Sequence, residues 1–152
     1  MKKTVQRFAR LVPLMAIVAA VLVPTVALAA DTSIQPHSAT LVAKGAEVDV
    51  TISFTCPVGL TIGGPFLMPG SGATVSLQQA VSKTEQAAGS GFSNGQACTG
   101  QSQTAIVPVL ANVPGPPFRK GPAVASAYLG ACDANFNCVY IQSGPVKVDI
   151  SR

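Results

Sequence analysis

Four cysteines are the residues of this chain with the best defined chemistry. They stand at Cys56, Cys98, Cys132 and Cys138. Cysteines in such numbers either pair as disulfides in an oxidising compartment or bind zinc. Zinc sites favour the C-x-x-C spacing and histidine partners, whereas this chain has no C-x-x-C and a single histidine, His37. The sequence therefore predicts two disulfides and no metal site.

The spacing of the cysteines favours one pairing of the three that are possible. Only five residues separate Cys132 from Cys138, which fits the tip of a β-hairpin closed by a bridge. Cys56 is then left to pair with Cys98. In the chain-entropy model, closing a loop of about 40 residues stabilises a fold by about 4 kcal/mol.

Residues that could do acid–base or nucleophilic chemistry are sparse. A Ser-His-Asp hydrolase would have to use His37, which precedes the first predicted strand beside Pro36 and is expected to be an exposed turn residue. One serine, Ser93, lies in a GxSxG pattern (91–95), but the sequence predicts no helix after it, whereas the nucleophile turn of a hydrolase lies between a strand and a helix. Glu47 and Asp49 share the outer face of one predicted strand, where both carboxylates face water. We expect a protein that is not an enzyme and that needs no cofactor.

Aromatic residues, in contrast, gather outside the predicted strands. Phe54 lies in a predicted strand, but the other phenylalanines after the N-terminal segment fall in predicted loops: Phe66, Phe92, Phe118 and Phe136. Apolar loop residues either fold back to cap the core or meet a partner. The sequence allows both readings.

The best candidate for a recognition tip is Phe66-Leu67-Met68, because Gly and Pro flank it on both sides and Met adapts to irregular surfaces. Phe118 and Phe136 are further candidate binding residues. For Phe118 we favour the other reading, in which the turn that begins at Phe118 lets its ring plug the end of the fold.

The N-terminus has the composition of an export signal. Basic residues at the start are followed by an apolar run over 11–23 and by the small residues Ala27-Leu28-Ala29, as a signal peptidase requires. Residues 1–29 are predicted to be a signal peptide and residues 30–152 a single domain. The product is expected to be secreted, extracellular or associated with the cell wall. No later apolar run reaches the length of about 20 residues needed for a membrane span.

Charge in the remaining domain is balanced. Six basic residues face six acidic ones: Lys44, Lys83, Arg119, Lys120, Lys147 and Arg152 against Asp31, Glu47, Asp49, Glu85, Asp133 and Asp149. Only Arg119 and Lys120 are adjacent basic residues, which is too few for a phosphate-binding track. We therefore expect no nucleic acid partner.

Short alternating segments position these residues. The clearest runs over 46–56, where apolar and polar residues alternate and Cys56 shares the apolar parity, so its side chain should point into the core. Weaker alternation recurs over 39–43, 75–81, 105–109, 123–129, 139–141 and 146–150. Pro108 cannot donate to a ladder and indicates an edge or a bulge. Long loops are expected over 63–72, 82–102 and 112–121.

About seven such strands, with Gly- and Pro-rich turns and no helical period, predict an all-β fold: an antiparallel immunoglobulin-like sandwich with two disulfides.

Three segments, VDVTISFTCPVG, ACTGQSQTAIVPV and PFRKGPAVASAYLGAC, resemble a group of small secreted actinobacterial proteins. The resemblance covers most of residues 38–151 and implies an immunoglobulin-like sandwich of unassigned activity. A more distant architectural likeness is to the apoproteins of neocarzinostatin-type chromoproteins, exported sandwiches with two disulfides and a crevice between loops. Both bridges of those proteins span short hairpins, whereas Cys56 and Cys98 are far apart in this chain.

The expected function is that of a monomeric, secreted, non-enzymatic binding or surface-associated module, whose partner is a protein or a small apolar ligand. One alternative is a carrier that holds an apolar ligand between the loops of Phe66, Phe118 and Phe136. Another is a secreted protease inhibitor. A carrier needs an enclosed pocket of about 300 Å³ or more, whereas a binding module needs only an exposed patch.

Overall fold

Strand β2 (Glu47–Thr55) shows how the sequence pattern becomes structure. Val48, Val50 and Ile52 are 0% exposed, whereas the residues between them are partly exposed. Successive side chains of a strand point to opposite faces, so one face of β2 lies in the core and the other faces outward. Cys56 continues the buried set, as its parity predicts.

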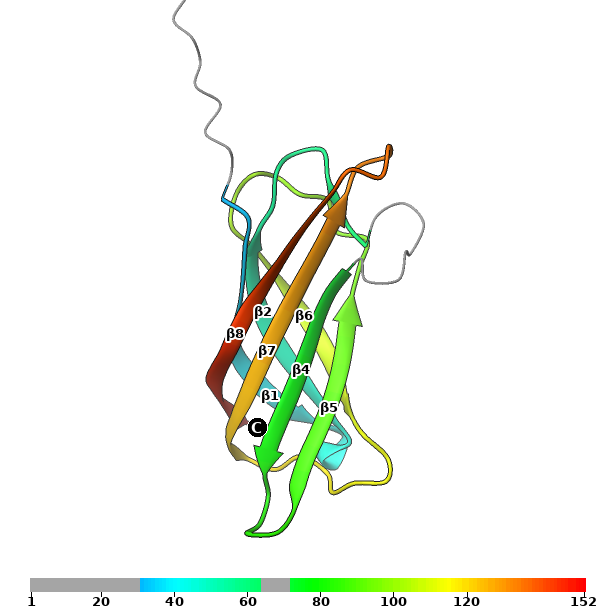
Figure 1. The fold of residues 1–152 in the computed structure, drawn as a ribbon. Helices are drawn as coiled ribbons and strands as arrows, with labels where there is room; N and C mark the ends of the chain where they lie inside the picture. The colour runs from blue at the N-terminus through cyan, green and yellow to red at the C-terminus, as the bar shows by residue number, and fades with distance from the viewer. Residues whose placement is uncertain (1–30, 64–71) are drawn as a thin grey trace, which may run out of the picture.

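The computed structural model describes residues 31–63 and 72–152, most of which lie in strands (Figure 1). Besides β2, these are β1 (Ser33–Val42), β3 (Thr61–Ile62), β4 (Gly72–Ala80), β5 (Gln86–Ser93), β6 (Gln103–Ala111), β7 (Gly121–Cys132) and β8 (Cys138–Ser151). A single 3-10 turn, η1 (Ala43–Gly45), links β1 to β2. The predicted signal peptide and the Phe66-Leu67-Met68 segment lie outside the described residues.

The strands close into a barrel. The strand order is β7-β4-β5-β6-β2-β1-β8, and β8 pairs with β7 to close the ring. The short β3 also pairs with β7, beyond the end of β4. Figure 1 shows β8, β7, β4 and β5 as one wall and β1, β2 and β6 as the wall behind it. Two short ladders join the walls, β5 with β6 and β1 with β8, and each consists of two residue pairs.

The all-β architecture and the two disulfides are confirmed, but the sheet is a closed, mixed barrel rather than the expected antiparallel sandwich. The sheet is mixed and closed because β1 pairs with β8 in parallel. The register of β1 against β2 shifts between Pro36 and Ser38, and a bulge of this kind bends a strand. Beyond the bulge, Ala39 and Thr40 pair with β8 and complete the ring.

The disulfides join the pairs that the spacing favours. Cys56 and Cys98, 42 residues apart in sequence, are bridged with a Cα–Cα distance of 5.3 Å. Cys132 and Cys138 close the β7–β8 hairpin at a Cα–Cα distance of 4.1 Å. Both bridges lie at the end of the barrel that carries the β7–β8 hairpin, because the Cys98 N–H donates to the Leu60 carbonyl at 2.9 Å and the next residue, Thr61, pairs with Cys132.

Two expectations about the strands were wrong. The stretch 82–102 is not one long loop, because Gln86–Ser93 forms β5 and pairs with β4 along its whole length. Its inward residues are Ala and Gly, so the apolar alternation that marks the other strands is absent. The last two predicted strands are one, β8, whose register against β7 shifts once, between Ala125 and Ala127.

Within the described residues, no helix has the length and hydropathy that crossing a bilayer requires.

Candidate functional site

Phe118 fills one end of the barrel core. Its side chain is 1% exposed, and its backbone N–H donates to the carbonyl of Gly45 at 2.9 Å. Gly45 has φ +91°, and a Cβ there would lie 2.1 Å from the Phe118 carbonyl oxygen, so only glycine fits this contact. The ring therefore plugs the fold, which is the reading the sequence favours, and does not stand exposed on the surface as a binding residue would.

Phe136 lies at the other end, at the tip of the β7–β8 hairpin, and is 52% exposed. Asp133 organises this tip: its carboxylate accepts hydrogen bonds from the backbone N–H groups of Asn135 (2.8 Å) and Asn137 (2.9 Å) and from the Asn137 side-chain amide (2.8 Å). These bonds, those from Asn137 foremost, lower the pKa of Asp133 below its ordinary value. Phe136 thus projects from a well ordered turn.

The barrel keeps Phe118 and Phe136 apart. Phe118 precedes β7 and Phe136 follows it, and the 12 residues of β7 span about 36 Å at the usual rise per residue. Figure 1 shows the loop before β7 and the β7–β8 hairpin at opposite ends of the molecule. The crevice between the loops of Phe66, Phe118 and Phe136 that a carrier was expected to use is therefore not formed by the last two.

Phe92 is not a loop residue but projects outward from β5 and is 69% exposed. Beside it on β6, the outward residues are also apolar: Ile106 is 61% and Leu110 59% exposed, and Pro108 between them is exposed too. Large apolar side chains exposed on neighbouring strands indicate a binding surface more strongly than single ones. We name Phe92, Ile106, Pro108 and Leu110 the apolar face.

A groove of about 320 Å³ runs through the apolar face, between Phe92 on one strand and Pro108 and Leu110 on the next. Glu47, Ser90 and Gly91 complete its lining. This volume matches the lower end of ligand pockets and suits one large side chain or a short chain segment.

Glycines in β5 bring the two walls of the groove together. A Cβ on Gly91 would lie 1.9 Å from the Pro108 carbonyl oxygen, and one on Gly89 would lie 2.2 Å from that of Leu110. Only residues without a side chain allow β5 to approach the β6 backbone so closely. The β5–β6 ladder ends at Leu110, before Pro108, which lacks the N–H to continue it. The expectation of an edge strand or a bulge at Pro108 was nevertheless wrong, because β6 lies between β5 and β2 and its register against β2 is unbroken at Pro108.

Acidic side chains border the apolar face on its other side. On β2, Glu47 is directly opposite Leu110 and Asp49 directly opposite Pro108. Cross-strand neighbours of this kind have Cβ atoms about 5 Å apart. The two carboxylates that the sequence placed on an outer strand face therefore flank the groove, and a basic group of a ligand would meet them there.

Most of this surface is not among the binding residues predicted from the sequence, although a sequence signal for it exists. The β6 segment TAIVPVLA is apolar at both parities, whereas its neighbour β2 is apolar at one. In a strand with one face in water, the second apolar set has no core to enter. The sequence predicts Phe92 in a loop, whereas the structure places it in β5.

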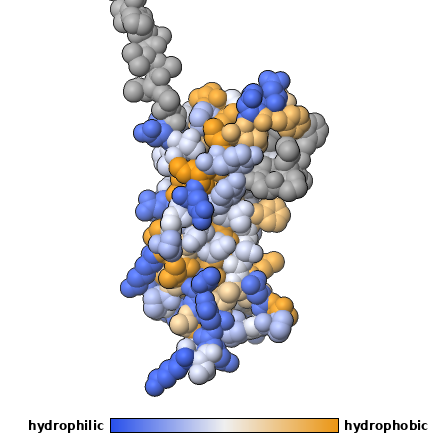
Figure 2. Space-filling model, viewed as in Figure 1, coloured by the Kyte–Doolittle hydropathy of each residue, from blue (hydrophilic) through white to orange (hydrophobic). Residues whose placement is uncertain are grey.

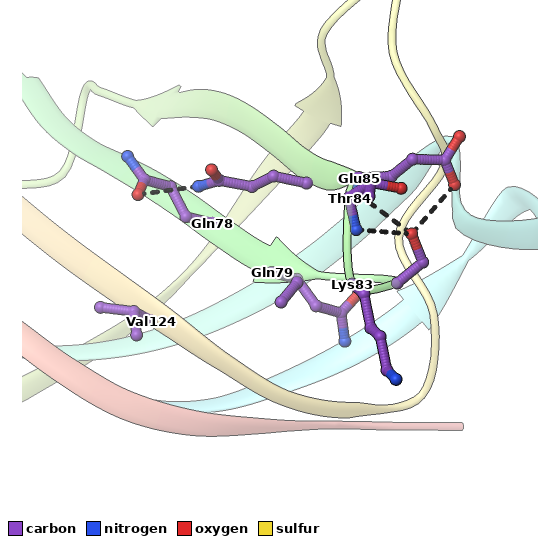
Figure 3. A pocket seen from close by; sticks show the side chains of 9 residues that line it. Gln78, Gln79, Lys83, Thr84, Glu85 and Val124 are labelled. Atoms are coloured by element: carbon purple, nitrogen blue, oxygen red, sulfur yellow. Dashed lines mark hydrogen bonds between the residues drawn. The ribbon is translucent and has the colours of Figure 1, made fainter.

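A second recess, shown in Figure 3, lies beside the β4–β5 turn and measures about 520 Å³. The polar groups around it are largely bonded to one another. Ser82 Oγ accepts the backbone N–H groups of Thr84 (3.3 Å) and Glu85 (3.1 Å), and the Gln86 amide donates to Gln78 Oε1 at 3.1 Å. These bonds stabilise the turn, and no set of groups is left aimed at a common ligand atom.

Two tyrosines on the β7–β8 wall contact each other. Tyr128 and Tyr140 stack with ring centroids 6.1 Å apart. Desolvation, and secondarily Tyr140, raises the pKa of Tyr128 above its ordinary value. On this wall, which faces the viewer in Figure 2, apolar and hydrophilic atoms are interspersed, without a broad apolar surface.

His37 occupies a different place from the one expected. It belongs to β1, at the bulge after Pro36, rather than to a turn ahead of the first strand, and its Nε2 hydrogen bonds to Ser53 Oγ on β2. No described carboxylate bonds to this pair to orient it as a triad requires. Among the described residues, no group of three or more His, Cys, Asp or Glu is placed to hold a metal.

No family model matches the chain, and neither does any curated protein or any solved structure.

Proposed function

We propose that the chain is an exported, monomeric, non-enzymatic binding module with an immunoglobulin-like arrangement of its two walls, and that its apolar face binds a segment of a protein partner. The observation that carries this proposal is the groove between Phe92, Pro108 and Leu110, lined on one side by Glu47. Export is supported by the composition of residues 1–29 and by the two disulfides, which persist in oxidising compartments.

The chemistry of the groove defines the partner segment. Exposed Phe92 and Leu110 would bury apolar area on binding, so the segment should carry a large apolar side chain as its anchor. Glu47 and Asp49 lie next to the groove, and a Lys or Arg beside the anchor would complement them. Apolar anchors supply most of the affinity at such interfaces, while charge at the rim supplies orientation.

A selection from displayed random peptides on the purified domain tests this proposal. The selected peptides should share a large apolar residue adjacent to a Lys or Arg. Replacing Phe92 and Leu110 together by Ser should weaken their binding at least about 30-fold, because both anchors are lost.

A matched control removes two exposed apolar side chains elsewhere, Val58 and Val124. The double change Val58→Ser and Val124→Ser should alter peptide affinity less than about twofold, as expected for sites outside an interface. Peptides that bind both double variants equally, or that lack the apolar–basic pair, would contradict the proposed site.

The carrier alternative draws no comparable support. The groove is open and lies on the outer face of the strands, and Phe118 and Phe136 are at opposite ends of the barrel. No described feature marks a reactive bond of the kind that a protease inhibitor presents.

A further inference from the structure

Basic residues far apart in the sequence meet at the closed end of the barrel, around the Phe118 plug. A cleft of about 750 Å³ is lined there by Leu41, Lys44, Phe118, Arg119, Lys120 and Arg152. Four of these six residues are cationic and none is acidic. They are four of the six basic residues that follow the predicted signal peptide. The net charge of the domain is balanced, but its basic residues are concentrated at this cleft.

Three cations of the cleft have no counter-ion among the residues that the structure describes. Among the described residues, none of Lys44, Arg119 and Lys120 forms an ion pair within 4.0 Å. Like charges gathered around one recess repel one another, and an anion bound between them relieves that repulsion.

Two separate sets of contacts hold the basic loops in place. Gln79, which is 4% exposed, donates its amide to the Arg119 carbonyl at 2.7 Å and accepts the Arg119 N–H at 2.8 Å. On the opposite side, Phe118 N–H bonds to the Gly45 carbonyl and ties η1 to the same loop. The backbone that carries the cations is thus ordered before any ligand arrives, which lowers the entropic cost of binding.

The turn that presents Lys44 is itself strained. Ala43 has φ 44° and Lys44 φ 57°, in the left-handed region that residues with a Cβ seldom adopt. Strain of this kind persists only where surrounding contacts enforce it, and it concentrates at functional sites. Here it turns the Lys44 side chain toward the cleft that Arg119 and Lys120 line.

We propose that this cleft binds a soluble anion that carries two or more phosphate groups. Guanidinium and ammonium groups together match phosphate oxygens, through paired hydrogen bonds from Arg and point charges from Lys. The volume exceeds what a single phosphate fills, and several separate cations favour a multivalent ligand. The cleft is a recess with Phe118 in its lining. A flat bilayer surface would therefore contact only the rim of the cleft.

Calorimetry with tripolyphosphate tests the site, with inorganic phosphate as the monovalent comparison. The wild-type domain should bind tripolyphosphate well above inorganic phosphate. The double variant Arg119→Gln and Lys120→Gln should lose at least about tenfold in affinity, since charge-assisted hydrogen bonds are lost. Both side chains are exposed, and the backbone of Arg119 keeps its bonds to Gln79.

The matched control is Lys83→Gln with Lys147→Gln, which removes the same net charge from exposed residues outside the cleft. Its affinity should stay within about twofold of wild type, because neither side chain lines the cleft and solvent screens the charge of both. Equal losses in the two double variants, no binding by the wild type, or binding only to vesicles of anionic phospholipid would each overturn the proposal. The apolar face is not involved, so this test and that of the peptide site can fail independently.

Discussion

Gln79 holds both backbone polar groups of Arg119, 40 residues away in sequence. Its side-chain amide donates to the Arg119 carbonyl and accepts the Arg119 N–H, at 2.7 and 2.8 Å. Gln79 is the one buried polar side chain among the described residues. A loop between β6 and β7 is thereby paired to β4 as a strand would be, and the Phe118 plug is held against the core.

Replacing Gln79 by Leu should lower the free energy of unfolding by about 2 kcal/mol, because two partly buried backbone groups lose their partner. Gln78 on the same strand is the control: it is exposed and bonds to the Gln86 side chain. Gln78→Leu should change stability by less than about 0.5 kcal/mol. Urea unfolding measures both, and equal effects would show that the Gln79 bonds contribute nothing specific.

Replacing a buried phenylalanine should lower the free energy of unfolding much more than replacing an exposed one. Phe118→Ala should cost about 3 to 5 kcal/mol, since it empties a buried site at the end of the core. Phe92→Ala should cost no more than about 0.5 kcal/mol, because its ring is exposed in the unbound protein. Denaturant unfolding of the single variants checks this, and a large loss for Phe92 would mean that its ring packs against the barrel.

The two disulfides should contribute unequally. In the chain-entropy model, the bridge of Cys56 and Cys98 closes the longer loop and contributes about 4 kcal/mol, against about 2 kcal/mol for Cys132 and Cys138. Changing both cysteines of one bridge to Ala, and comparing unfolding midpoints, measures each contribution. A larger loss from the hairpin bridge would contradict the loop-length argument.

Acid should loosen the β7–β8 hairpin tip. The pKa of Asp133 is lowered from the ordinary 3.8 by its bonds to Asn137 and Asn135, so their stabilising effect is present above pH 3.8 and is lost as the pH falls through the lower, folded-state pKa. The amide resonances of Asn135 and Asn137 should shift together in that range in an NMR titration. In Asp133→Asn the same titration should be absent; if it persists, another group is responsible.

The local sequence pattern was enough to predict the elements that have one clear apolar face. The alternation around Val50 predicts β2 and the burial of Cys56, and the short spacing of Cys132 and Cys138 predicts the hairpin bridge. These features depend on residues close in sequence. The same holds for the plug, where Gly and Pro around Phe118 indicate a turn.

Features that depend on contacts between residues far apart in the sequence were not predicted. β5 is built from Ala and Gly that fit close to β6, so its sequence lacks the apolar alternation by which strands are recognised. Closure of the barrel depends on a bulge after Pro36 that brings β1 to β8. The basic cleft joins Lys44 to Arg119 and Lys120, which are separated by most of the domain and meet only in the folded chain.

The central claim is that the apolar face is the binding surface, and amide chemical-shift mapping tests it most directly. A peptide with an apolar anchor beside a Lys or Arg, taken from the selection on the wild-type domain, is titrated into isotopically labelled protein. Bound, it should perturb the amides of Glu47, of residues 90–92 and of residues 106–110, and leave those of the β7–β8 hairpin unchanged. Perturbations centred on the hairpin around Phe136, or spread evenly over the barrel, would contradict it.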